Sequence, residues 1–146
     1  MNLEYIAQQI VNGLILGSMY AMVAIGFSMI YGIIRLINFA HGEFFMAGGM
    51  TSTVFLASAL AASGFMNEYP VVYMILVMIL SMFTAMIVAL ITERIAYRPL
   101  RRAPRLVPLI TAIGASFFWQ YFFRGLFGSA LIPFPVPEIF DGRVNL

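Results

Sequence analysis

The feature that most constrains this chain is a run without any charged side chain, from Ile10 to Ile34. A helix needs about 20 residues to cross a hydrocarbon core about 30 Å thick, so this run is long enough to span a bilayer. Three further apolar runs follow it. The sequence therefore predicts an all-α membrane protein with one transmembrane domain over residues 1–146, whose spans cover residues 10–34, 44–65, 71–92 and 106–127.

The composition agrees with this class and excludes several functions. Hydrophobic residues make up 62% of the chain and charged residues 10%, and the mean hydropathy is +0.96. The chain has no cysteine and no lysine, which excludes thiolate metal sites and a P-loop. One histidine without an HExxH pattern argues against a zinc hydrolase, and there is no GxSxG nucleophile motif. We expect no catalytic residue, no metal site and no cofactor.

Five of the eight arginines lie in one polar loop, Glu93–Arg105. Such clustering is typical of a cytoplasmic loop of a membrane protein rather than of a surface that binds nucleic acid. If this loop is cytoplasmic, the hairpin at Arg35 is on the same side, and Met1 and the tail from Gly128 are outside. The loop arginines are Arg94, Arg98, Arg101, Arg102 and Arg105.

Small residues recur along one face of the first span. They are Gly13, Gly17, Ala21, Ala24, Ser28 and Gly32. At about 100° per residue they stay within an arc of roughly 100°, and such a stripe lets helices approach closely in lipid. We expect this helix to be packed among others, and the third span, rich in large aliphatic residues, to be more exposed to lipid. The alternative is that glycine and alanine are common in any transmembrane helix.

A polar stretch, Arg35 to Met50, joins the first two spans. An ionisable group near a bilayer centre costs roughly 2.5 to 3.5 kcal/mol, so the stretch is a candidate functional site. Asn38, His41 and Glu43, beside Gly42, are candidates for a helix break that lines or gates a substrate pathway. In a continuous helix Glu43 is rotated about 160° from His41, so one shared face would need a break at Gly42. The alternative is that His41 and Glu43 only stabilise the start of the second helix.

The fourth span ends in an aromatic run, residues 117–123, followed by Arg124. This pattern is typical of an aromatic belt at a membrane interface, and an aromatic ligand box is the alternative. The tail has prolines at alternate positions from Pro133 to Pro137, which predicts an extended extramembrane segment.

Two segments carry a resemblance to a known family. Residues 13–49, GLILGSMYAMVAIGFSMIYGIIRLINFAHGEFFMAGG, resemble the first part of the permease subunit of bacterial ABC importers for branched-chain amino acids. Residues 91–120, ITERIAYRPLRRAPRLVPLITAIGASFFWQ, resemble the next part. The combination of INFAHGE with ERIAYRPLR is specific, and the resemblance covers nearly the whole chain up to the tail.

The resemblance implies a multi-pass permease in the lipid bilayer of the bacterial inner membrane. It implies a second permease subunit, two cytoplasmic ABC ATPases that hydrolyse the ATP, and a periplasmic binding protein that delivers leucine, isoleucine or valine. Related members carry urea or short amides, which is an alternative. The chain is expected to be an N-terminal half of such a permease, truncated or split, and inactive by itself; a membrane scaffold without transport is the further alternative.

Overall fold

The computed structural model describes residues 3–35, 37–104 and 106–140, and these contain helices and connections but no strand. Four helical stretches in this part of the chain are long and apolar enough to cross a membrane. They are Tyr5–Ile33, His41–Ala62, Pro70–Leu100 and Leu106–Phe127. The prediction of an all-helical membrane protein with four spans is confirmed.

Each span corresponds to one helix or to a series of continuous helical segments. The first is α1 (Leu3–Ile34), and the second joins α2 (His41–Thr51), the π-helical η1 (Ser52–Ala57) and α3 (Ser58–Ala62). The short α4 (Phe65–Glu68) leads into α5 (Pro70–Thr92), which continues through the π-helical η2 (Glu93–Tyr97) and the 3-10 turn η3 (Arg98–Leu100). The last elements are α6 (Leu106–Phe127) and the 3-10 turn η4 (Glu138–Phe140).

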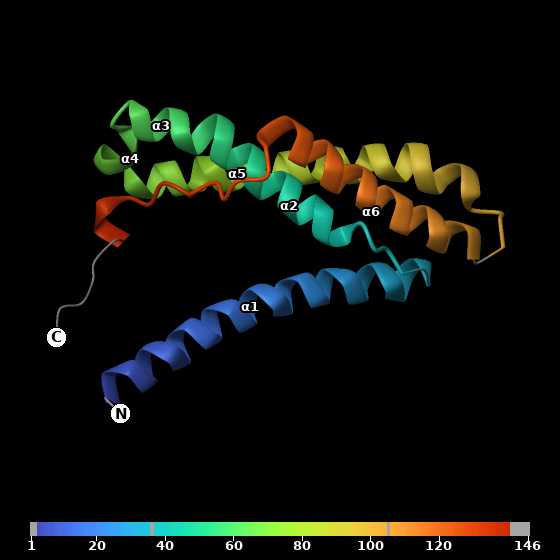
Figure 1. Cartoon of the computed structure of the whole chain (residues 1–146), viewed down its shortest axis with the longest axis horizontal. Coiled ribbons are helices and arrows are strands. Elements are labelled where there is room, and N and C mark those ends of the chain that lie inside the picture. The colour runs from blue at the N-terminus through green and yellow to red at the C-terminus, as the bar shows by residue number, and fades with distance from the viewer. Residues whose placement is uncertain (1–2, 36, 105, 141–146) are drawn as a thin grey trace.

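Helices α2, α5 and α6 form the packed part of the molecule, and α1 lies along one side of it (Figure 1). Close approach of α2 to α5 depends on Gly48, because a Cβ there would lie 2.6 Å from the backbone oxygen of Ser81 and 3.3 Å from the Cβ of Ala85. Such small residues let helix backbones approach each other. The buried cluster beside this crossing consists of Ala40, Phe44, Ala47, Val88, Trp119 and Phe123.

The expectation that the third span is more exposed than the first is wrong within this chain. None of the α1 span is buried, against 11% of the α5 span. The reason is that α5 presents Ser81, Ala85 and Ala89, one turn apart, towards α2 and the core.

The small-residue stripe of α1 has no packing role within the described chain. No atom of a neighbouring described element lies within 4 Å of where a Cβ would stand at Gly13, Gly17 or Gly32. Instead α1 meets the bundle through Gly26, where a Cβ would come within 2.7 Å of the His41 ring. At 100° per residue, this contact side is on roughly the opposite face from the stripe. Packing of the stripe against another chain stays a prediction.

Part of the aromatic run lies in the core and not in an interfacial belt. Trp119 and Phe123 are buried against α2 and α5, whereas Phe118 and Tyr121 are exposed. The run is on a helix with 3.6 residues per turn, so some of its rings point towards the core and others away from it.

The tail, residues 128–137, has neither helix nor strand, as expected for its prolines, but it continues along the bundle towards the start of α5 (Figure 1). The hydroxyl of Tyr73, near the start of α5, donates a 2.7 Å hydrogen bond to the carbonyl of Pro135, and Pro137 is buried. The tail therefore packs against the spans and does not extend freely from them.

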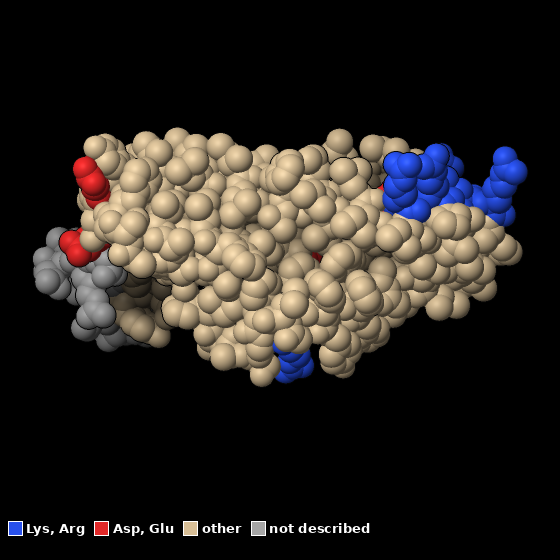
Figure 2. Space-filling model, turned by 90° about the horizontal axis from the view of Figure 1, so that it is seen from above, with Lys and Arg blue, Asp and Glu red and all other residues tan. Residues whose placement is uncertain are grey.

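The two polar connections, residues 35–40 and the segment after α5, lie at the same end of the molecule (Figure 1). We call it the arginine end, because Figure 2 shows basic side chains gathered there and acidic ones at the opposite end. Arg94, Arg98, Arg101 and Arg102 are exposed, and Arg105 is outside the described residues. The shared end agrees with the predicted topology, and the side of the membrane it faces stays a prediction.

Candidate functional site

A short connection separates α1 from α2, which begins at His41. Arg35 has a φ of 54°, in the left-handed region that non-glycine residues rarely adopt. The Asn38 side-chain oxygen accepts a 3.1 Å hydrogen bond from the Ala40 amide, which forms a local turn that leads into α2. The chain is helical through Gly42, which is exposed in the first turn of α2, so the helix is not broken there.

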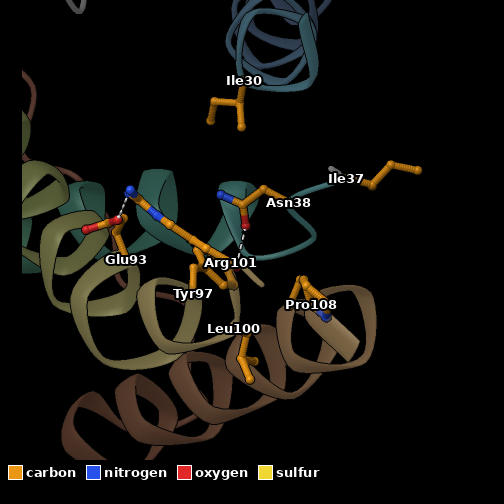
Figure 3. A pocket seen from close by; sticks show the side chains of 9 residues that line it. Ile30, Ile37, Asn38, Glu93, Tyr97, Leu100, Arg101 and Pro108 are labelled. Carbon is orange, nitrogen blue, oxygen red and sulfur yellow. Dashed lines mark hydrogen bonds and ion pairs between the residues drawn. The ribbon is translucent and has the colours of Figure 1, made fainter. Parts of the chain in front are cut away.

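The same oxygen of Asn38 binds a residue far along the chain. The hydroxyl of Tyr97 donates to it a hydrogen bond of 2.6 Å (Figure 3). Tyr97 ends the π-helical segment η2, and such segments are rare and frequently mark functional sites. The motifs INFAHGE and ERIAYRPLR, which are far apart in the sequence, thus meet at one contact. Sequence reasoning missed Tyr97; its place in the second motif was the available signal.

An ion pair lies beside this contact. Arg101 binds Glu93 over 2.5 Å across η2 and η3 (Figure 3). The side chains are 70% and 40% exposed, so water screens the pair and it contributes little to stability. Among the described residues, no cluster of three or more His, Cys, Asp or Glu could hold a metal ion.

Two cavities meet at Asn38 and Tyr97. The smaller, about 100 Å³, lies at the arginine end, between the 35–40 connection, η3 and the start of α6 (Figure 3). The larger, about 560 Å³, lies between α1, α2 and α5 and includes His41. Glu93 also lines it, and the other lining residues are apolar: Met22, Val23, Ile30, Phe44, Phe45, Ala85, Met86 and Ala89. Polar side chains therefore gather at one end of an apolar space.

His41 and Glu43 face different neighbours, as expected for residues about 160° apart on one helix. The His41 ring packs against Gly26 and lies 6.4 Å from the Phe27 ring in an edge-on arrangement. The carboxylate of Glu43 accepts a 3.1 Å hydrogen bond from the Ser116 hydroxyl on α6. Asn38 and His41 thus share the larger cavity, and Glu43 belongs to the contact between α2 and α6.

A buried hydrogen-bonded pair supports this end of α5. The indole N–H of Trp119 donates a 2.8 Å bond to the Thr92 hydroxyl, which in turn donates to the Val88 carbonyl over 2.7 Å. Thr92 directly precedes η2. The pair therefore joins α6 to α5 where the helix changes to its π-helical form.

Comparison with known proteins shows the family to which the chain belongs. A family model described as the permease component of the branched-chain amino acid transport system matches residues 9–141. The chain belongs to this family of transport permeases.

Individual relatives match shorter parts. Over 56 residues the chain is 52% identical to the high-affinity branched-chain amino acid transport system permease protein LivH of Salmonella typhimurium and of Escherichia coli K12. Over 67 residues it is 48% identical to the corresponding protein BraD of Pseudomonas aeruginosa. These alignments cover 38% and 46% of this chain, but 18% and 21% of the relatives. No solved structure shows a significant match.

Proposed function

We propose that this chain forms part of the translocation path for leucine, isoleucine and valine in an ABC importer of the bacterial inner membrane. The observation that carries the proposal is the family match over residues 9–141. The four apolar spans, with polar side chains confined largely to one end of a cavity, support it.

The proposal includes partners. Without lysine the chain cannot form a P-loop, so ATP hydrolysis is assigned to two cytoplasmic ATPases. A periplasmic binding protein delivers the amino acid, and a second permease subunit completes the path. The small-residue stripe of α1 faces away from the bundle and is the surface available to that subunit.

The larger cavity matches the chemistry of these substrates. A branched-chain amino acid combines a zwitterionic head with an aliphatic side chain, and ligand sites are mostly apolar with a few placed polar groups. Asn38 and His41, with Glu93 and Tyr97, provide dipoles and charge at one end. Asn38, in the connection between the first two spans, brings one of these polar groups to the cavity.

The other two candidates have different roles. Glu43 acts through Ser116 by holding α2 against α6. Gly42 leaves the first turn of α2 without a side chain, and a Cβ there would meet no atom of a neighbouring described element within 4 Å. A substitution at Gly42 is therefore tolerated sterically within this chain.

The test is uptake of labelled leucine by cells that lack their own branched-chain transporters and express the chain with a complementary C-terminal half and the full set of partners. Uptake should require the binding protein, and isoleucine and valine should compete while urea and acetamide do not. His41→Ala should reduce uptake, and Glu68→Gln, at the opposite end, should not. Competition by urea would favour the alternative substrate class, and complete absence of uptake would favour a scaffold.

A further inference from the structure

The two cavities that meet at Asn38 and Tyr97 share part of their lining. Four residues line both of them: Ile30, Asn38, Glu93 and Tyr97. Two of these four bind each other, since the Tyr97 hydroxyl donates to Asn38 over 2.6 Å. The bond joins the α1–α2 connection to the end of α5, and Figure 3 shows it beside the smaller cavity.

We propose that this hydrogen bond is a latch: Tyr97, acting through Asn38, closes the passage between the larger cavity and the smaller one. The inference rests on the proposed function, because the molecule that passes would be a zwitterionic amino acid with a branched aliphatic side chain. Tyr97 is a positioning residue in this scheme, and the latch opens when its hydroxyl leaves Asn38.

The acceptor side of the latch is held in place. The Asn38 oxygen also accepts from the Ala40 amide, so its position is tied to the turn that starts α2. Arg35, three residues before Asn38, has a left-handed backbone conformation, and α1 ends at the residue before it.

The donor side lies where the helix geometry changes. Tyr97 ends the π-helical segment η2, and a 3-10 turn containing Pro99 follows at once. Upstream, Thr92 and Trp119 anchor α5 to α6 by a buried bond. The helical geometry of the segment after Thr92 can therefore change while the anchored part of α5 stays in place.

A single neutral hydrogen bond suits a latch. Its net contribution favours the closed form several-fold, yet a conformational change in a transporter can break it. The Glu93–Arg101 pair does not serve this purpose, because its two residues are eight positions apart in the segment that follows α5 and the pair does not join that segment to the α1–α2 connection.

The absence of cysteine permits a direct test. Val23, which lines the larger cavity from α1, is replaced by cysteine in the assembled transporter in membrane vesicles. The vesicles are oriented so that Ala103→Cys, in the arginine-end loop, reacts with an added charged methanethiosulfonate. Reaction of Val23→Cys should be slow, and Tyr97→Phe should accelerate it about fivefold, the factor expected for one net hydrogen bond. Tyr121→Phe, at an exposed tyrosine of α6, should leave the rate unchanged.

Substitutions of the acceptor, Asn38, test whether the faster reaction comes from loss of this hydrogen bond or from a general loosening of the structure. Asn38→Asp keeps an acceptor oxygen and should keep the slow rate, whereas Asn38→Leu, which also removes the bond to the Ala40 amide, should react at least as fast as Tyr97→Phe. The double variant Asn38→Leu/Tyr97→Phe should react no faster than Asn38→Leu alone. Unchanged rates in Tyr97→Phe and Asn38→Leu, or a fast rate already in the parent Val23→Cys chain, would overturn the latch. Absence of leucine uptake by the parent transporter would count against the proposed function, and the thiol rates would still decide on the latch.

Discussion

Tyr97 and Asn38 are 59 residues apart in the sequence and share a hydrogen bond of 2.6 Å. Asn38 follows the first span, and Tyr97 ends the π-helical continuation of the third. Because Asn38 also fixes the turn before α2, this one contact relates the end of α1, the start of α2 and the end of α5. It brings together the two motifs by which the chain resembles its family.

The crossing of α2 and α5 should depend on Gly48. Gly48→Ala places a Cβ 2.6 Å from the backbone oxygen of Ser81, so the helices must separate, and overpacking of this kind costs about 1–3 kcal/mol. The measurement is thermal unfolding of the purified protein in detergent. Gly49→Ala is the control, since a Cβ there meets no neighbouring described atom within 4 Å. Equal melting temperatures of the two variants would contradict the prediction.

Thr92→Val should destabilise the protein, because it leaves the buried indole N–H of Trp119 without its acceptor. An unsatisfied buried donor costs about 1–3 kcal/mol. Thr111→Val is matched to it, since Thr111 donates to the carbonyl four residues earlier in the same way and has no side-chain bond to another of the described helices. Unfolding in a denaturing detergent series should show a clear loss of stability for Thr92→Val alone. A similar loss of stability in both variants would mean that it comes from the hydrogen bond within the helix and not from the bond to Trp119.

The two faces of α1 should respond differently to enlargement. Gly17→Leu, on the small-residue stripe, should reduce co-purification of the second permease subunit and leave the stability of this chain unchanged. Gly26→Leu should lower the chain's own stability, because the new side chain displaces the His41 ring. Undiminished co-purification of the partner with Gly17→Leu would show that the stripe does not form that interface.

Glu43→Gln should reduce leucine uptake several-fold, because a hydrogen bond to a charged acceptor is roughly twice as strong as a neutral one. Ser116→Ala, which removes the donor on α6, should produce a similar loss. Glu68→Gln is the control, since Glu68 is exposed at the opposite end and water screens its charge. A loss confined to Glu68→Gln would refute this role of Glu43.

Topology can be measured with single cysteines. With the arginine end in the cytoplasm, an impermeant thiol reagent added to intact cells should label Ser129→Cys and not Ala103→Cys. Opening the cells should make Ala103→Cys reactive as well. Labelling of Ala103→Cys alone in intact cells would show that the arginine end faces outwards.

The sequence by itself determined the helices and the class of protein. Hydropathy and length are local properties, so the fourth span, Leu106–Phe127, could be predicted with the bounds the structure has. The predicted second span begins three residues later than the observed one, because the polar stretch from His41 is already helical. The family motifs are also local, which is why the resemblance could be recognised without coordinates.

Only the tertiary structure decided which faces of these helices meet. Lipid is as apolar as a leucine side chain, so a hydrophobic pattern cannot distinguish a face that packs on a helix from one that meets lipid. For this reason the sequence could not place Trp119 in the core, turn the α1 stripe away from the bundle, or select Tyr97 as the partner of Asn38. Each of these depends on residues more than 25 positions away or in another helix, and such contacts exist only once the helices have packed.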